Sequence, residues 1–223
     1  WCTPLISSHG QNDLLLVGLP LRLFGLNPLT GNEVWSSGGL GKIIVATPHV
    51  SENAIVALSG YGGPAIAVKP GGTGDVTESH RLWIHDQKNP QRVGSGVVVG
   101  DCLYILNEPG IAWCVEVLTG QVLWKQRLGE AASWSSICQA EDRLYATDKQ
   151  GTTFVFEPDP SECIVLATNP LGERMHASLA FSDGQIFART PEHLYCLESP
   201  KKPTSSEPSI ASPPADNESP PSR

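Results

Sequence analysis

A ten-residue pattern occurs twice in this chain and constrains its fold more than any other feature. It reads LNPLTGNEVW from Leu26 to Trp35 and VEVLTGQVLW from Val115 to Trp124. Both copies combine alternating apolar residues, a Thr-Gly turn and a terminal tryptophan. Repetition of one short pattern at a fixed distance is the signature of a repeat architecture.

Two independent sets of landmarks give the period of the repeat. A turn residue precedes an apolar run at five places, and the steps between them are 40, 48, 41 and 41: Asp13, Asn53, Asp101, Asp142 and Asp183. Three tryptophans advance by 48 and then by 41: Trp35, Trp83 and Trp124. Because both sets lengthen at the same place, we predict a unit of about 41 residues with a seven-residue insertion in the second unit.

Each unit has the pattern of four short strands. In the third unit the runs VGSGVVV, DCLYILN, IAWCVEV and QVLWKQR are separated by turn residues, which indicates antiparallel strands joined by hairpins. Gly31 and Gly120 supply the positive φ that the turns from third to fourth strand need. A four-stranded unit of about 40 to 45 residues is typical of a β-propeller blade. The sequence therefore predicts an all-β fold of four-stranded antiparallel blades.

The blades can be placed along the chain at about residues 3–38, 42–88, 91–127, 132–167 and 175–198. The last provides three strands, so we expect about 4.75 blades in an incomplete or open ring. Residues 199–223 hold seven prolines, seven serines and no aromatic residue, which predicts a disordered tail. We expect the exposed edges of an open ring to pair with another chain, giving dimers or aggregates.

Composition disfavours several functions. The formal net charge is −8, and no clustered Lys and Arg run offers the basic face that nucleic acid needs. No apolar run reaches the roughly 18 residues of a transmembrane helix. The six cysteines include no CxxC motif and no adjacent pair, so neither a zinc site nor a redox motif is indicated. We expect most of them to behave as small buried apolar groups within strands.

The two copies of the repeat resemble the tryptophan-docking motif of the PQQ-like propellers, a superfamily that includes quinoprotein alcohol dehydrogenases and BamB. The stretches SGYGGPAIAVKPGGTGDVTESHRLWIH, NPQRVGSGVVVGDCLYILNEPGIAWCVEV and ASLAFSDGQIFARTPEHLYCL are similar to exported PQQ-like proteins of planctomycete-type bacteria. The second unit departs from the motif, with Gly74-Asp75 in place of Thr-Gly, and the fourth lacks both turn and tryptophan. Members of that group are about twice as long and form rings of seven or eight blades. The resemblance therefore implies that an N-terminal propeller half is missing here.

The resemblance implies two functions. One is a non-catalytic binding or scaffold module of the bacterial cell envelope, periplasmic or secreted, that engages a protein or a carbohydrate without a cofactor. The alternative is a fragment of a PQQ-dependent quinoprotein dehydrogenase, which uses PQQ and a calcium ion held by oxygen ligands, with adjacent cysteines over the cofactor. The chain has no Cys-Cys pair and its acidic residues are scattered, so no catalytic residue, cofactor ligand or metal ligand is assigned.

Binding residues are expected in loops, since propeller connections from second to third strand and from one blade to the next share one face. Five polar or aromatic residues in these loops are our candidates for contact with a ligand or partner: Tyr61, Arg92, Asn107, Glu108 and Trp134. For Asn107 and Glu108 a role in tight turns is an open alternative, because turns favour such residues. Turn chemistry does not require Arg92 or Trp134.

The repeated tryptophans, in contrast, are predicted to be structural. Trp35, Trp83 and Trp124 each place a ring near the outer edge of a blade, where it can bury about 150 to 250 Å² against the next blade. His80 and His85 flank Trp83. We expect both on one strand, pointing to opposite faces, which does not favour metal binding.

Overall fold

The computed structural model describes residues 2–9, 12–86 and 93–199 of the chain, which form five β-sheets. The first sheet contains β1 (Leu5–His9), β2 (Asn12–Leu19), β3 (Arg22–Leu26) and β4 (Glu33–Gly38). The second contains β5 (His49–Val50), β6 (Ile55–Leu58), β7 (Ala65–Val68) and β9 (Arg81–His85). The third contains β10 (Val97–Val99), β11 (Cys102–Asn107), β12 (Ile111–Glu116) and β13 (Val122–Arg127). The fourth contains β14 (Cys138–Ala140), β15 (Arg143–Thr147), β16 (Thr152–Phe156) and β17 (Val165–Pro170). The fifth contains β18 (Ala180–Ser182), β19 (Gln185–Arg189) and β20 (Leu194–Glu198).

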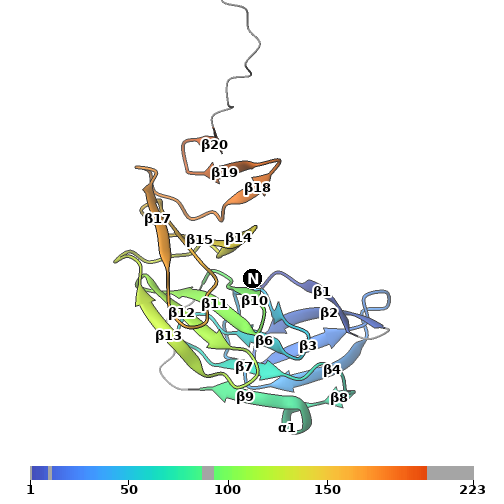
Figure 1. The fold of residues 1–223 in the computed structure, drawn as a ribbon. Helices are drawn as coiled ribbons and strands as arrows, with labels where there is room; N and C mark the ends of the chain where they lie inside the picture. Colours follow the sequence, from blue (N-terminus) through green and yellow to red (C-terminus); the bar gives the residue numbers. More distant parts are fainter. Residues whose placement is uncertain (1, 10–11, 87–92, 200–223) are drawn as a thin grey trace, which may run out of the picture.

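These sheets have the topology of propeller blades. Consecutive strands of each blade pair antiparallel, as hairpins require. Figure 1 shows the blades following one another along an arc whose first and last members do not meet. The predicted all-β, open propeller is therefore confirmed. The predicted tail lies outside the described residues beyond Ser199.

The insertion in the second unit joins the first two blades. Its short strand β8 (Gly74–Asp75) pairs parallel with β4 at the edge of the first sheet. Asp75 forms an ion pair with Arg22 of β3 at 2.8 Å. The Gly38 amide donates a 2.8 Å hydrogen bond to Thr77 Oγ1. Gly74-Asp75, which stands where the repeat has Thr-Gly, is thus an edge strand. One expectation is corrected here: His80 ends helix α1 (Thr77–His80) instead of sharing a strand with His85.

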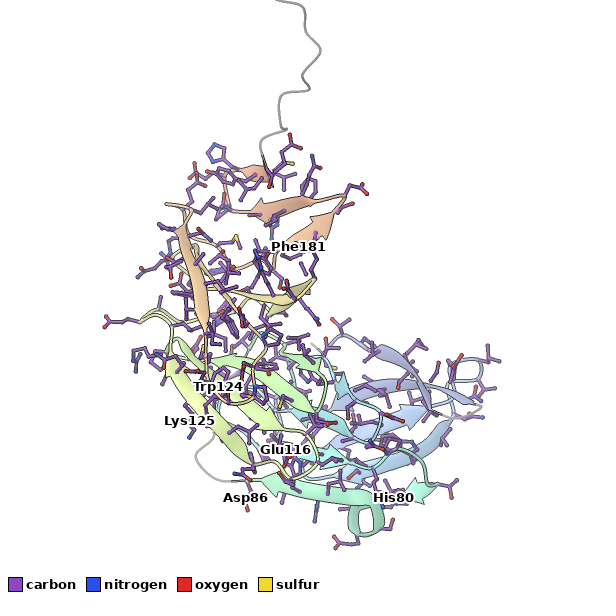
Figure 2. The ribbon with its side chains drawn as sticks, viewed as in Figure 1. His80, Asp86, Glu116, Trp124, Lys125 and Phe181 are labelled. Atoms are coloured by element: carbon purple, nitrogen blue, oxygen red, sulfur yellow. The ribbon has the colours of Figure 1, made fainter. Side chains whose placement is uncertain are left out.

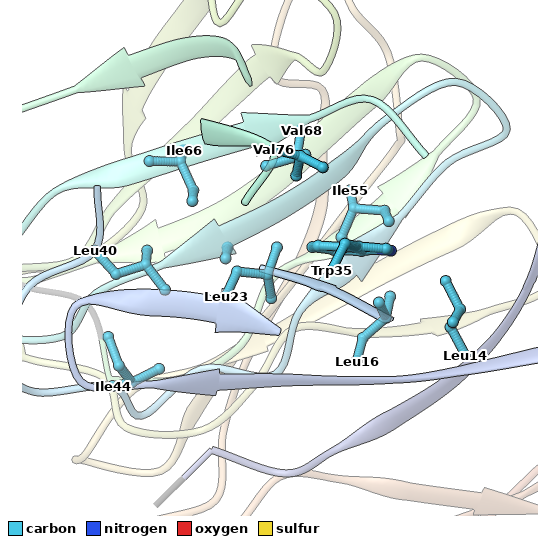
Figure 3. Packing of buried hydrophobic residues seen from close by; sticks show 11 residues of the cluster. Leu14, Leu16, Leu23, Trp35, Leu40, Ile44, Ile55, Ile66, Val68 and Val76 are labelled. Atoms are coloured by element: carbon cyan, nitrogen blue, oxygen red, sulfur yellow. The ribbon is translucent and has the colours of Figure 1, made fainter. Parts of the chain in front are cut away.

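A continuous apolar core fills the space between the first two blades. Trp35 is fully buried at its centre, and Figure 3 shows its ring among Leu23, Ile55 and other aliphatic side chains. Its position follows from a small residue on the neighbouring strand: Gly25 lies opposite Trp35, and a Cβ at Gly25 would come within 2.4 Å of the indole. Trp35 thus packs across its own blade and against β6 of the next.

The other two repeated tryptophans each donate a hydrogen bond to the following blade. Trp83 Nε1 lies 2.9 Å from the carbonyl oxygen of Val117, and Trp124 Nε1 lies 2.9 Å from that of Asp159. Both side chains are half-buried, and Figure 2 shows Trp124 on the outer strand of its blade. That these two tryptophans stabilise the docking of one blade on the next stays a prediction.

A second series of contacts links the blades near their inner strands. The amide of Thr47 donates to Ser95 Oγ at 2.9 Å, the amide of Ser95 to Ser136 Oγ at 3.1 Å, and the amide of Ser136 to Ser178 Oγ at 2.9 Å. The partners are 48, 41 and 42 residues apart, which match the steps of the repeat to within one residue. Equivalent serines therefore satisfy equivalent backbone donors from blade to blade.

The cysteines differ from the expectation in their burial. Cys102 and Cys114 are buried on neighbouring strands, Cys2, Cys138 and Cys163 are half-buried, and Cys196 is exposed. All six thiols are free. Burial raises the pKa of Cys114 to about 12, so this thiol is not a ready nucleophile at neutral pH.

Candidate functional site

Four side chains meet where blades three, four and five present their loops at one end of the sheets. Glu108 follows β11, Trp134 precedes β14, Lys149 follows β15 and His176 precedes β18. Because β11, β13, β15 and β17 run in the same direction within their blades, the loops that follow them share one face. We call these four residues the loop-face cluster.

The indole of Trp134 is the centre of the loop-face cluster. Its Nε1 donates a 3.0 Å hydrogen bond to Glu108 Oε1, which also accepts a 3.4 Å bond from Lys149 Nζ. The same ammonium lies 3.8 Å from the centroid of the indole, and the His176 ring lies 5.1 Å away. Trp134 is nevertheless 41% exposed, whereas the side chains of Glu108 and Lys149 are 16% and 22% exposed. The ordered ion pair therefore holds a partly exposed aromatic ring in one orientation.

Backbone contacts between the loops fix this arrangement. Lys149 donates its amide to the carbonyl of Ala132 at 2.8 Å and accepts a 3.2 Å bond from the Met175 amide, so the loops of blades four and five are joined. On either side of Trp134, the hydroxyls of Ser133 and Ser135 donate to the Thr147 carbonyl at 2.7 and 2.5 Å. The indole therefore projects from a rigid loop.

Two of the five predicted binding residues, Glu108 and Trp134, are brought together by this geometry. Asn107 adjoins Glu108 but is fully buried, and neither polar atom of its amide has a hydrogen-bond partner among the described residues. Tyr61 is half exposed in the turn after β6, at a positive φ of 53°, and contacts no member of the cluster by any recorded hydrogen bond or ring contact. Arg92 lies outside the described residues.

Sequence reasoning did not select Lys149 or His176. The repeat itself carried the signal: Lys149 stands 41 residues after Glu108, and His176 stands 42 after Trp134. Residues at equivalent positions of adjacent blades are neighbours in a propeller. The spacing could therefore have predicted that Lys149 lies beside Glu108 and His176 beside Trp134.

A pocket of about 440 Å³ adjoins the cluster between the β17–β18 connection and the end of β19. Its lining includes Arg174, Met175, His176, Arg189, Thr190 and Pro191. His176 belongs to both the pocket and the cluster, so the two form one surface.

Glu173 anchors the connection that carries this pocket. Its carboxylate accepts hydrogen bonds from the hydroxyls of Tyr195 and Thr190, the latter at 2.7 Å, and lies 2.8 Å from His193 Nδ1. These bonds, led by that from Tyr195, lower the pKa of Glu173. The carboxylate is therefore engaged by blade five and is not a free acid or base.

The described residues contain no group of three or more His, Cys, Asp or Glu side chains placed to hold a metal ion. Nor does any helix in these segments have the length and apolarity needed to cross a membrane. The loop face carries an aromatic ring, an ion pair and basic side chains.

The fold and its loop-bearing face define a β-propeller. Residues 3–126 match the model of the family described as outer membrane protein assembly factor BamB, which has PQQ-like repeats. The chain therefore belongs to this family of PQQ-like β-propellers. No curated protein sequence matches it.

Solved structures agree on the fold. BamB from Moraxella catarrhalis is similar at 11% identity with a TM-score of 0.53, over 86% of this chain and 70% of that one. The β-propeller domain of Cps50 (Swd1) from Myceliophteria thermophila has 12% identity and a TM-score of 0.62, over 85% and 66%. Quinohemoprotein alcohol dehydrogenase from Comamonas testosteroni has 10% identity and a TM-score of 0.66, over 88% and 41%. At such identities the likeness concerns the fold alone.

Proposed function

We propose that this chain is a non-catalytic binding module of the cell envelope that engages a protein partner through its loop face. The observation that carries the proposal is the loop-face cluster, in which a partly exposed indole is held by the Glu108–Lys149 ion pair. Tryptophan on a rigid support is a frequent energetic centre of protein interfaces. The family description, an assembly factor for outer membrane proteins, supports a protein partner and an envelope location.

A carbohydrate partner is less well supported by the same geometry. Sugar rings usually stack on an open aromatic face. The indole of Trp134 already contacts the Lys149 ammonium at 3.8 Å and the His176 ring at 5.1 Å. These neighbours leave less of the ring face for a sugar.

The second candidate is a fragment of a quinoprotein dehydrogenase, which the fold of the Comamonas enzyme brings into consideration. That chemistry needs a calcium ion with several oxygen ligands. The described residues do not gather such a set of carboxylates. Adding PQQ and calcium and measuring dye-linked alcohol oxidation tests this alternative, and turnover would replace our proposal.

Capture of a partner from envelope extract of the source organism tests the binding module directly. We compare the immobilised wild-type chain with Trp134→Ala and with Leu118→Ala, a control at the opposite end of blade three whose side chain is similarly exposed. We expect one defined protein, identified by mass spectrometry, to be retained by the wild type and the control but lost by Trp134→Ala. Circular dichroism melts verify that both variants fold. Equal retention by Trp134→Ala would contradict the proposal.

A further inference from the structure

The pocket beside the loop-face cluster collects positive charge in an otherwise acidic protein. Arg174 and Arg189 reach it from the β17–β18 connection and from the end of β19, and His176 completes the basic lining. The two arginines are 15 residues apart in the sequence and are brought together only by the fold. No run of basic residues in the sequence indicates this site.

These two arginines are also distinguished by what they lack. Arg22, Arg81 and Arg143 are paired with carboxylates. The guanidinium of Arg127 donates to two backbone carbonyl oxygens. Among the described arginines, only Arg174 and Arg189 have no ion pair or side-chain hydrogen bond with a described residue.

This lack of partners is unexpected in a chain with 23 acidic and 15 basic residues. Carboxylates are in excess, so a surface arginine has many available partners. Glu173, the neighbour of Arg174 in the sequence, is instead bonded to Thr190, His193 and Tyr195. Both guanidinium groups therefore keep their donors free at one pocket.

We propose that this pocket binds carboxylate side chains of an acidic peptide segment in the protein partner, an inference that rests on the proposed function and specifies its chemistry. Guanidinium groups bind carboxylates through two parallel hydrogen bonds, which gives both affinity and orientation. A pocket of about 440 Å³ has room for such side chains, and Met175 and Pro191 add apolar wall for their methylene groups. The net charge of −8 repels acidic ligands elsewhere, which concentrates binding here.

Fluorescence anisotropy with two labelled peptides tests this inference. The first peptide alternates Asp and Glu with Gly and Ser, and the second replaces every Asp by Asn and every Glu by Gln. The variants are Arg174→Ala, Arg189→Ala and the control Arg143→Ala, an exposed arginine at the opposite end of blade four that pairs with its neighbour Asp142. All three substitutions alter exposed side chains, and thermal melts confirm that the variants fold.

We expect the wild-type chain to bind the acidic peptide, more weakly as salt is added, and to ignore the amide peptide. Each pocket substitution is expected to weaken binding by about tenfold, as loss of a charge-assisted contact does, while Arg143→Ala binds normally. Absence of binding, equal binding of the amide peptide, or an equal loss in Arg143→Ala would overturn the inference. Arginine-dependent binding of polygalacturonate without binding of the peptide would also overturn it.

The outcomes separate this inference from the proposed function. If Trp134→Ala loses the captured partner but the acidic peptide does not bind, the module stands and the pocket assignment fails. If the peptide binds through the arginines but capture is insensitive to Trp134, the proposed function fails.

Discussion

The indole Nε1 of Trp124, on the outer strand of blade three, donates a 2.9 Å hydrogen bond to the carbonyl of Asp159 in blade four. Replacing Trp124 by Phe keeps an aromatic ring but removes the donor. We expect this change to lower the free energy of unfolding by about 1 kcal/mol, as loss of one hydrogen bond does. Chemical denaturation with urea measures the effect.

Trp113 provides the matched control for that substitution. It is half-buried like Trp124, but its Nε1 has no partner among the described residues. Phe at this position retains a ring face for the Lys125 ammonium, which lies 3.8 Å from the indole centroid. Trp113→Phe should therefore cost less than Trp124→Phe, and an equal cost would argue against interblade docking by the hydrogen bond.

Gly31 and Gly120 occupy equivalent Thr-Gly turns and separate backbone strain from blade contact. Their φ angles are 73° and 75°, but a Cβ at Gly31 meets nothing within 4 Å, whereas one at Gly120 comes within 2.7 Å of the Trp83 indole of the preceding blade. We expect Gly31→Ala to cost about 1 to 2 kcal/mol from strain alone. Gly120→Ala should cost roughly 1 to 3 kcal/mol more, because the ring must move. Equal losses in urea denaturation would show that Trp83 does not depend on this turn.

The repeat explains why so much of the fold could be predicted. Thr-Gly turns and alternating strands are local signals, and a period of about 41 residues orders them into blades. The role of the insertion could not be predicted, because β8 pairs in parallel with β4 of another blade. That pairing is accompanied by the Arg22–Asp75 ion pair and by a hydrogen bond between Gly38 and Thr77, 39 residues apart, for which the local sequence has no pattern.

The buried imidazole of His49, on the innermost strand of blade two, makes stability depend on pH. Burial lowers the pKa of His49 to about 4, while the unfolded residue titrates near 6.5. The unfolded chain therefore binds more protons between these values, and the free energy of unfolding should fall by up to roughly 3 kcal/mol as pH drops through this window. In His49→Leu, which cannot titrate, we expect this part of the pH dependence to vanish from urea denaturation curves measured across the window. An unchanged slope would show that His49 is not the group responsible.

Strand β20 forms the outer edge of the three-stranded fifth blade and has no further partner strand among the described residues. Leu194, at the start of β20, is 70% exposed. An exposed apolar edge strand can pair with a second chain. We expect concentration-dependent association by light scattering, which Leu194→Lys should reduce because a charged edge resists pairing. A monodisperse wild-type monomer would contradict this expectation.

The candidate site was predictable only in part. Glu108 and Trp134 were chosen because propeller loops share a face, which is a property of the topology rather than of these residues, and the two side chains are in contact. Asn107 was chosen by the same rule, yet its amide is buried. The pocket with Arg174 and Arg189 was not predicted, because the two arginines belong to separate segments that only the folded blade brings together.

Site-specific photo-crosslinking tests the central claim, that the loop face binds the partner. A photoreactive residue at Gln150 lies in the exposed turn beside Lys149 and leaves the cluster intact, and one at Leu118 samples the opposite end of the adjacent blade. Irradiation in envelope extract should join the partner to the chain through position 150 and not through position 118. A crosslink through position 118 alone, or equally through both positions, would contradict the assignment of binding to the loop face.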